Sequence, residues 1–568
     1  METDTGLIGH WRLAGDCRDS SPAQRHGVNH GADLSAEGPD GRAKGAAAFG
    51  GRKARIDVPD SDVFRLATGD FTVSVWVHTE KILDDVLGDI AGKYDPESRT
   101  GLNFGIQNLA GVTSSQSNYR HLHFGIDSGR MPTAWADCGR PGNCVYACAL
   151  AVYEGGLYAG TFETGQNEAG HVYRYADGTE WIDCGAPDLC NAVTALAVWD
   201  GALYAGVSHY RSIGSSLDES PNLTPGGRIY RYDGDKTWTD CGKLGGAAGT
   251  AAYNIAYMKR FAGWNPEDVD GIHGLAVYKD RLYATPMYHQ GLFRYEGETE
   301  WTDCGSPGVR LMSLGVFDGD LYAAGNEGNQ RGGVFRYDED AGWMRTGDQP
   351  GVDQVYSLAV HNGKLYAGTW PDATVFRYDG GETWKTTGRL GNELEVMAMV
   401  VYNGKLYAGT LPQAEVYRYD EKKTWTSTGQ LDTTPNVRYR RAWSMAVSQG
   451  KLFCGVLPSG RVYALEAGVN VTYDSELAPG WRHLAAVRDE NRLKLYVDGA
   501  LAAASRAFNP ADYDISNSRP LLIGSGAHSG FNGRISDLRL YNRALTGPEI
   551  AAAFSRRQAR APHLASDA

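Results

Sequence analysis

Histidine, tyrosine and arginine side chains cluster in two short segments of this chain, at residues 208–211 and 287–290. Together these residue types suit β-elimination on a uronate sugar. Arginine would neutralise the carboxylate and acidify the neighbouring carbon, a neutral histidine or tyrosine would take that proton, and a second such group would protonate the leaving oxygen. The predicted catalytic residues are His209, Tyr210, His273, Tyr288 and His289. The predicted substrate-binding residues are Arg211, Glu163, Trp264, Arg310 and Arg441.

The same residues also have structural interpretations, which the sequence leaves open. His209 and His289 are equally typical of solvated loop tips, and His273 of a hydrogen-bonded residue on an inner strand. The basic cluster at residues 438–441 is typical of a charged surface loop. This set of residues requires no metal or cofactor, although three histidines on one face could hold zinc.

A sequence repeat must position these residues. Between Trp135 and Tyr463 one pattern returns about every 40 to 80 residues, a period typical of propellers and solenoids. Each unit reads Leu-Ala-Val, Leu-Tyr-Ala-Gly, Val-Tyr-Arg-Tyr and Trp-x-Asp-Cys-Gly, which predicts four short strands with alternating apolar residues. Four such strands form one propeller blade.

The repeat predicts a closed ring of seven blades. The Leu-Tyr step recurs at Tyr158, Tyr204, Tyr283, Tyr322, Tyr366 and Tyr407, with Leu452-Phe453 as a seventh copy. The seventh unit lacks a fourth strand, and residues 135–139, which precede the first unit, match the missing one. An N-terminal strand that completes the last blade hides two open sheet edges. In such a ring, Gly129 and Val469 should lie near each other.

The loops after the Leu-Tyr step divide the ring into two sectors. In matching register the seven units carry Glu163, His209, Tyr288, Glu327, Pro371, Pro412 and Pro458. The last three units have short proline turns, whereas the first four have longer loops with ionisable or hydrogen-bonding tips. Since a ring that serves only as a scaffold has no need of this asymmetry, the pattern predicts that one sector of the face is specialised. A lyase site would lie over blades two and three of that sector.

The two ends of the chain carry a second set of strand motifs. Asp19-Ser20-Ser21 and residues 71–77 stand in the early piece, while Trp481-Arg482-His483, residues 495–499 and residues 531–545 stand in the late piece. Neither piece has enough strands to close a two-sheet core alone. These motifs, over about 210 residues, resemble the concanavalin A-like lectin/glucanase superfamily in its laminin-G-like jelly-roll branch. The resemblance implies a sugar binder, an adhesion module or a spacer.

The resemblance also bears on cofactors and on catalysis in the jelly roll. Some members of the superfamily hold calcium, and Asp19 and Asp537 would be the candidate ligands in this chain. A glucanase site would need a Glu-x-Asp-x-x-Glu type of strand, which neither flanking piece contains. The resemblance therefore does not imply glucanase activity.

The sequence thus predicts an all-β protein in which a discontinuous jelly-roll sandwich is interrupted by a propeller. The predicted segments are residues 1–129 and 469–557 for the sandwich, residues 130–468 for a seven-bladed β-propeller closed by an N-terminal fourth strand, and residues 558–568 for a disordered tail.

The net charge, the N-terminal segment and the cysteine positions limit the kinds of function that this protein could have. A formal net charge of −13 argues against nucleic-acid partners, which need a basic face. No apolar run is long enough to span a bilayer, so no membrane partner is expected. No signal peptide follows Met1, which predicts a cytoplasmic protein, or a secreted one if the start has been trimmed. Four of the nine cysteines stand in the repeated Asp-Cys-Gly step, typical of small buried residues.

Three functions are consistent with this sequence. The first is a carbohydrate-binding protein that recognises an acidic poly- or oligosaccharide. The second is a polysaccharide lyase, because the ring resembles in architecture the seven-bladed rings of some polysaccharide lyases, including ulvan lyases, which carry histidine, tyrosine and arginine over the central depression. The third is a non-catalytic interaction scaffold.

Overall fold

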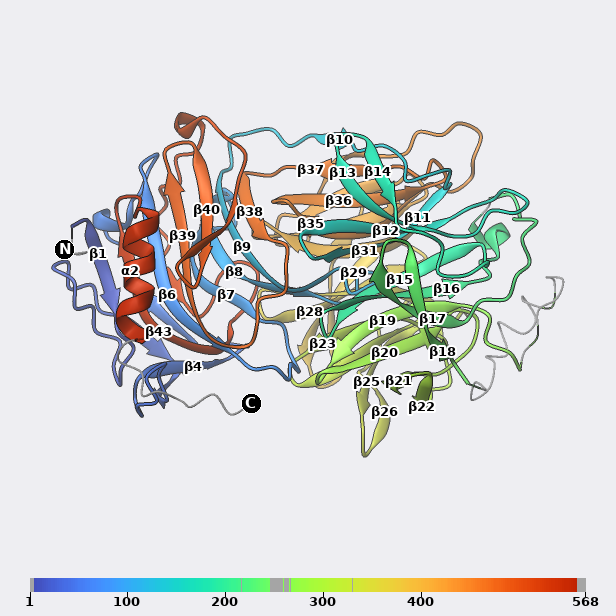
Figure 1. The fold of residues 1–568 in the computed structure, drawn as a ribbon, viewed down its shortest axis with the longest axis horizontal. Coiled ribbons are helices and arrows are strands. Elements are labelled where there is room, and N and C mark those ends of the chain that lie inside the picture. Colours follow the sequence, from blue (N-terminus) through green and yellow to red (C-terminus); the bar gives the residue numbers. More distant parts are fainter. Residues whose placement is uncertain are drawn as a thin grey trace.

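The computed structural model describes residues 5–215, 217–245, 259, 265, 267–328 and 330–558. Strands dominate this part of the chain and form two bodies side by side (Figure 1). One body holds strands from both ends of the chain, and the other is a propeller-like ring built from the middle. The class predicted from the sequence, an all-β protein with a propeller, is confirmed at this level.

The first body contains two large sheets that each combine early and late strands. One sheet runs in the order β3 (Asp33–Ala36), β4 (Ala46–Gly50), β43 (Asn532–Tyr541), β6 (Phe71–Thr79), β39 (Gly480–Asp489), β40 (Arg492–Val497), β41 (Ala500–Ala504), with β1 (Leu7–Trp11) paired to β43. The other runs β2 (Val28–His30), β5 (Arg55–Val58), β42 (Leu521–Ile523), β7 (Gly88–Asp95), β8 (Thr100–Leu109), β9 (Asn118–Ser128), β38 (Val469–Tyr473).

The two sheets share one apolar core. Phe71 of β6 packs edge-on against Phe124 of β9, with ring centroids 5.9 Å apart. The outer face of β6 is buried as well, because helix α2 (Gly547–Gln558) covers it and Phe554 stacks on Trp76. Thr546 and Glu549 form a capping box at the start of α2. Gln558, which the sequence assigned to a disordered tail, is the last residue of this helix, and residues 559–568 lie outside the described part.

The ring consists of five separate four-stranded antiparallel sheets and one eight-stranded sheet. The four-stranded sheets are β19 (Ile272–Tyr278), β20 (Arg281–Pro286), β21 (Phe293–Gly297), β22 (Glu300–Asp303); β23 (Leu311–Phe317), β24 (Asp320–Gly325), β25 (Gly333–Asp338), β26 (Gly342–Arg345); β27 (Gln354–His361), β28 (Lys364–Trp370), β29 (Thr374–Gly380), β30 (Thr383–Arg389); β31 (Glu395–Tyr402), β32 (Lys405–Leu411), β33 (Glu415–Tyr419), β34 (Trp425–Gln430); and β35 (Arg441–Ser448), β36 (Lys451–Leu457), β37 (Val462–Leu465), β10 (Trp135–Asp137).

The eight-stranded sheet joins two groups of four strands. They are β11 (Tyr146–Tyr153), β12 (Gly156–Phe162), β13 (Val172–Asp177), β14 (Glu180–Asp183) and β15 (Ala192–Trp199), β16 (Ala202–Ser208), β17 (Arg228–Gly234), β18 (Thr237–Lys243). A single residue pair, Phe162 with Ala192, links β12 to β15. Short 3-10 turns complete the described elements at η1 (Asp62–Phe64), η2 (Ser212–Ser215) and η3 (Pro510–Asp512).

The ring closes on itself through its innermost and outermost strands. The innermost strands contact one another in the order β11, β15, β19, β23, β27, β31, β35 and then β11 again. Strand β10 pairs with β37, with Trp135 opposite Leu465, as predicted for the closing strand. This pairing covers the outer edge of the last sheet with a segment that precedes the first.

A regular tryptophan hydrogen bond joins neighbouring groups of strands. The indole N–H of Trp238 donates to the Cys184 carbonyl of the preceding group at 3.0 Å, and Trp301 donates to the Cys241 carbonyl at 2.8 Å. Each such tryptophan also packs on the tyrosine of its own Arg-Tyr step, as Tyr295 does on Trp301 at 5.0 Å. The repeated Arg-Tyr and Trp-x-Asp-Cys-Gly steps are therefore structural. All nine cysteines are free thiols.

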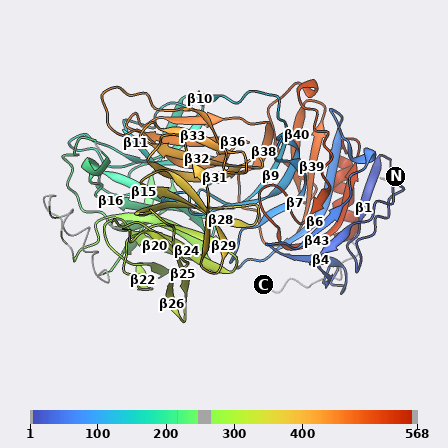
Figure 2. The ribbon, with the colours of Figure 1, turned by 180° about the vertical axis from the view of Figure 1, so that it is seen from behind.

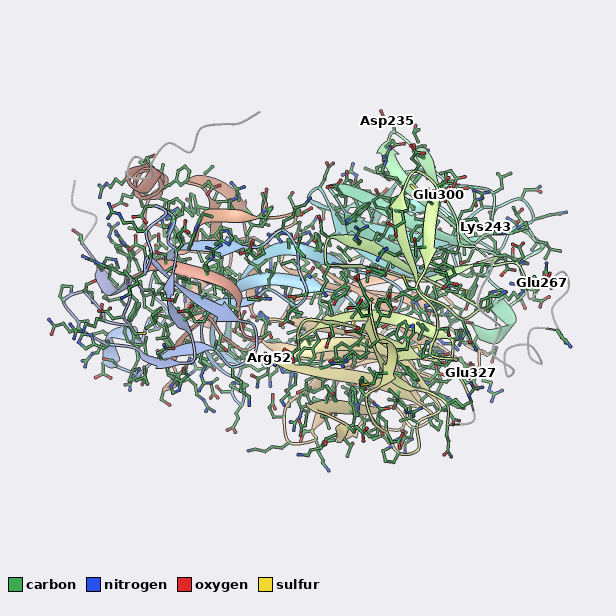
Figure 3. All side chains as sticks on the ribbon, turned by 90° about the horizontal axis from the view of Figure 1, so that it is seen from below. Arg52, Asp235, Lys243, Glu267, Glu300 and Glu327 are labelled. Carbon is green, nitrogen blue, oxygen red and sulfur yellow. The ribbon has the colours of Figure 1, made fainter. Side chains whose placement is uncertain are left out.

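The two bodies meet where the ring begins and ends. Strand β38 pairs with β9, and Val469 lies opposite Ile126, so the segment between them leaves and re-enters one sheet edge. That sheet lies between the ring and the sheet of β6 and β39, as Figure 2 shows from behind. Arg52, labelled in Figure 3, forms an ion pair with Asp318 of the ring. No helix of the described residues is long and apolar enough to cross a membrane.

Candidate functional site

A cavity of about 390 Å³ opens at the centre of the ring, where the innermost strands begin. Polar and aromatic side chains line it: Ser114, Tyr146, Thr194, Tyr210, Arg211, Ser215, His273, Met287, Tyr288, Arg310, Met312, Gln354, Tyr356, Trp370, Leu394, Glu395, Leu411, Tyr439, Arg441 and Trp443. Its volume falls within the roughly 300–1,000 Å³ that is common for small-molecule sites. The ring therefore has one central site to which many strands contribute.

Six of the ten predicted site residues line this cavity. They are Tyr210, Arg211, His273, Tyr288, Arg310 and Arg441. Glu163, His209 and His289 are buried but do not line it. Trp264 lies outside the described residues. Tyr210, Arg211, His273 and Tyr288 of blades two and three thus line the cavity, whereas His209 and His289 do not.

Glu163 and His289 are buried but are not among the residues that line the cavity. Glu163 accepts a hydrogen bond from the Thr161 hydroxyl at 3.0 Å, and burial raises the pKa of its carboxyl to about 7. His289 has no exposed surface, so it is not a solvated loop residue. The repeat alignment that predicted these positions gives the place of a residue along its loop but not the direction of its side chain.

Arg211 forms a compact group with Asp270 and Tyr288. Its Nη2 donates to Asp270 Oδ2 at 2.5 Å, and its guanidinium lies 5.1 Å from the centroid of the Tyr288 ring. The backbone N–H of Arg211 donates to the Tyr288 hydroxyl at 2.9 Å. His209 stands beside this pair, with Nδ1 3.9 Å from Asp270 Oδ2. Burial, aided by the Arg211 charge, lowers the pKa of His209 and keeps its ring neutral.

His273 has a defined tautomer. Its Nδ1 lies 2.6 Å from the Met312 carbonyl oxygen, which can only accept, so Nδ1 carries the proton and Nε2 carries the lone pair. Burial, together with the charge of Arg310, lowers the pKa of His273 to about 3. The imidazole is therefore neutral at physiological pH, and its remaining nitrogen is an acceptor at the cavity wall.

Glu395 and Tyr356 form a second polar group that the sequence prediction missed. The Tyr356 hydroxyl lies 3.1 Å from Glu395 Oε1 and 2.5 Å from Gln354 Oε1. Arg441 Nε lies 4.0 Å from Glu395 Oε2. Burial raises the pKa of Glu395, and the Arg441 charge opposes that shift. The signal for these residues was available, since each stands at or near the start of an inner strand, in line with His273.

Arg310 differs from the other two cavity arginines in its partners. Its guanidinium donates to the Asn326 carbonyl at 3.2 Å, to the Met287 carbonyl at 3.3 Å and to the Asn326 side chain. Within the described part of the chain, no carboxylate lies within 4 Å of its guanidinium nitrogens. Buried Glu327, labelled in Figure 3, accepts from the Arg310 backbone N–H instead.

Trp443 joins the aromatic side chains of the cavity. Its ring lies 5.5 Å from Tyr146, 6.2 Å from His273 and 6.5 Å from Tyr356, measured between centroids. Tyr146 contacts Tyr210 in turn at 5.5 Å. An aromatic surface therefore lies in the same cavity as the three arginines, and of its members sequence analysis predicted Tyr210 and His273.

The calcium candidates of the flanking body are engaged by protein donors. The Asp19 carboxylate accepts from the backbone N–H groups of His10, Ser21 and Arg25 at 2.8, 2.8 and 2.7 Å. Asp537 pairs with His10 Nε2 at 2.6 Å. Among the described residues, no group of three histidine, cysteine, aspartate or glutamate side chains could hold a metal ion. Calcium binding at Asp19 and Asp537 stays a prediction from the resemblance.

A comparison with protein families matches the later part of the chain. A family model described as the concanavalin A-like lectin/glucanases superfamily matches residues 419–551. The match begins within the last strands of the ring and ends in α2, while the early strands of the two-sheet body lie outside it. No curated protein sequence matches the chain.

Solved structures resemble this chain over 59% of its length at low sequence identity. They include a catalytically inactive virginiamycin B lyase from Staphylococcus aureus with quinupristin, at 11% identity and TM-score 0.43, covering 59% of this chain and 99% of that one. YCF48 bound to D1 peptide has 9% identity and TM-score 0.38, covering 59% and 97%. The WD40 β-propeller domain of Doa1 has 12% identity and TM-score 0.39, with the same coverage of 59% and 97%.

Proposed function

We propose that this protein binds an acidic oligo- or polysaccharide in the central cavity of its ring. The observation that carries the proposal is the set of three arginines that line the cavity beside the aromatic surface around Trp443. Arginine recognises carboxylates with paired N–H donors, and aromatic faces stack on the apolar faces of sugar rings. Both kinds of group line the same cavity.

The charges of the cavity favour an anionic ligand. Arg211 is neutralised by Asp270, and Arg441 has Glu395 at 4.0 Å. Arg310 has neutral partners, which leaves one positive charge at the cavity wall without a carboxylate among the described residues. A uronate carboxylate would supply the missing anion.

Protonation states favour binding over catalysis. A general base works best with a pKa near the operating pH. His273 has a pKa of about 3, and burial raises the pKa of Tyr288 and Tyr356 well above the usual tyrosine range, so none of them is matched to that task in the free protein. We therefore place the lyase second. The observation in its favour is the His273 lone pair beside the cationic Arg310.

We also propose that the ring has seven blades and that the sandwich comprises residues 1–129 and 469–557, with the ring at 130–468. The eight-stranded sheet has only one residue pair between its two groups of four strands, which supports counting it as two blades. The circular contacts of the seven innermost strands support the same count.

Binding is tested by calorimetric titration of tetrasaccharides from polygalacturonate, alginate and heparosan, with cellotetraose as the neutral control. We expect an acidic tetrasaccharide to bind, and Arg310→Ala to weaken that binding at least tenfold. The matched control is Arg461→Ala, because Arg461 also lies in the ring but pairs with Asp137 outside the cavity. Equal affinity for the neutral sugar, or unchanged affinity of Arg310→Ala, would contradict the proposal.

Lyase activity is tested separately with the same acidic polysaccharides, by following ultraviolet absorbance from new unsaturated chain ends. The binding proposal predicts a flat signal with the wild-type protein. A rising signal that is lost in His273→Ala and retained in His289→Ala would establish the lyase instead, since only the first of these residues lines the cavity.

A further inference from the structure

The hairpin of β8 and β9 extends from the two-sheet body into the ring. Its tip, residues 110–117, is here called the hairpin tip, and Thr113 to Ser117 are each at most 2% exposed. The run Thr113-Ser114-Ser115-Gln116-Ser117 is polar and uncharged. Since buried polar groups require hydrogen-bond partners, the burial of this run needs an explanation.

The partners are backbone groups of the innermost strands. The Leu358 N–H donates to the Gly111 carbonyl at 3.0 Å, and the Leu275 N–H donates to the Ser114 carbonyl at 3.2 Å. Gln116 N–H donates to the Leu196 carbonyl at 3.1 Å. The hairpin tip thus bonds to strands on different sides of the ring, which places it on the ring axis.

Three more residues of the hairpin, Ser117, Asn118 and Gln107, form hydrogen bonds with further innermost strands of the ring. The Val152 N–H donates to the Ser117 carbonyl at 2.9 Å. Asn118, the first residue of β9, accepts from the Val447 N–H at 3.0 Å and donates to the Val447 carbonyl at 2.7 Å. Gln107 Nε2 donates to the Val401 carbonyl at 3.4 Å. The hairpin therefore satisfies backbone groups of the inner sheet edges that would otherwise face an open channel.

The hairpin tip also reaches the cavity. Ser114 lines it, together with His273 and Trp443. The Ser114 carbonyl accepts from the N–H of Leu275, two residues beyond His273, and the Ser114 hydroxyl donates to the Cys148 carbonyl at 3.4 Å. The Thr113 hydroxyl lies 3.2 Å from the Trp443 carbonyl oxygen. Thr113 holds a φ of +47°, a conformation that a β-branched residue rarely adopts and that the surrounding contacts must maintain.

We propose that Ser114 forms the floor of the ring's binding site and limits how deeply a sugar unit can enter. This inference rests on the proposed function. Ser114, which belongs to the two-sheet body, would then contact the bound sugar. The site would be a cavity closed at its inner end and lined by residues of both bodies. Ser114 is a binding residue in this proposal, because its side chain would touch the ligand.

The test compares Ser114→Phe, Ser114→Ala and Ser117→Ala by calorimetric titration with the acidic tetrasaccharide that the wild-type protein binds. Ser117 is the matched control, because it is a buried serine of the same hairpin tip that does not line the cavity. We expect Ser114→Phe, which fills the floor, to weaken binding at least tenfold. Loss of the hydroxyl in Ser114→Ala should weaken it about two- to tenfold, and Ser117→Ala should leave it unchanged.

Circular dichroism and the thermal midpoint establish whether each variant is folded. If Ser114→Phe folds and binds like the wild type, the floor assignment is wrong. If that variant does not fold, Ser114→Ala decides, and an affinity within twofold of the wild type overturns the assignment. Loss of binding in Arg310→Ala alone leaves the proposed function standing without the floor. Absence of any acidic-sugar binding removes both proposals.

Discussion

Burial sets the protonation state of the ionisable residues in and around the cavity. His209 and His273 are held neutral by desolvation and by neighbouring arginines, even though Asp270 stands 3.9 Å from His209. Burial raises the pKa of the Glu395 carboxyl, and the charge of Arg441 opposes that shift. The cavity therefore offers neutral polar groups alongside its arginines, an arrangement suited to sugar hydroxyls next to a carboxylate.

Glu163 gives a prediction at the scale of a single residue. Its pKa is about 7 in the folded protein and 4.5 ordinarily, so folding favours the protonated form. The part of the folding stability that depends on a protonated Glu163 is therefore fully present below pH 4.5 and is lost as the pH rises through 7. The neutral isostere Glu163→Gln should therefore stabilise the protein by about 3 kcal/mol at pH 8.5 and have little effect at pH 4.

Thermal unfolding of both proteins across this pH range measures the effect. Glu180→Gln is the control, because Glu180 is an exposed strand residue of the same group of four strands. If Glu163→Gln and the wild type had the same thermal midpoint at pH 8.5, the pKa of Glu163 would not be raised in the folded protein.

At the scale of elements, tryptophan hydrogen bonds join five of the groups of strands to the one before, through Trp181, Trp238, Trp301, Trp384 and Trp425. The bond uses a carbonyl of the Asp-Cys-Gly step in the early groups, as in Trp301 to Cys241, and a threonine carbonyl in later groups, as in Trp384 to Thr346. The cysteine side chain is thus dispensable for the bond. The bond therefore tolerates threonine at the position that cysteine occupies in the early groups.

Trp343 supplies an internal comparison for these bonds. Its indole N–H has no acceptor among the described residues, whereas Trp301 donates at 2.8 Å. Both rings pack on the tyrosine of their own group, at 5.1 and 5.0 Å. Trp301→Phe should therefore cost about 1 kcal/mol more than Trp343→Phe, because only the first change removes a hydrogen bond. Differential scanning calorimetry tests this, and equal midpoints for the two variants would refute the role of the bond.

At the scale of the whole molecule, the ring and the two-sheet body are interdependent. The ring segment leaves and returns at the paired strands β9 and β38, and the hairpin tip of the same sheet fills the ring axis. His528 lies across the junction, since it pairs with Asp89 and accepts from the Gly404 N–H at 2.8 Å. The flanking body thus closes one end of the ring and leaves the cavity at the other.

Shortening the hairpin tests this dependence. Replacing residues 110–117 by a two-residue Asn-Gly turn should lower the unfolding temperature of the ring by several degrees, because backbone groups on its inner strands lose their partners. Hydrogen exchange should rise at the Leu275 and Leu358 amides. The control is a variant with an altered turn at residues 339–341, which is exposed and remote from the axis. Unchanged exchange at both amides would contradict the proposed role of the hairpin.

The sequence by itself determined the repeating strands, the closing strand and the pairing of distant chain ends. Alternating apolar residues and the recurring Trp-x-Asp-Cys-Gly step depend on local backbone geometry, so they can be recognised without coordinates. The sequence also identified six residues of the cavity, because loop register follows from the repeat. Only the tertiary structure showed that His289 and Glu163 turn away from the cavity, that Glu395 and Trp443 face it, and that residues 110–117 occupy the ring axis. These features depend on contacts between residues far apart in the chain, where desolvation and hydrogen-bond partners are set by the complete fold.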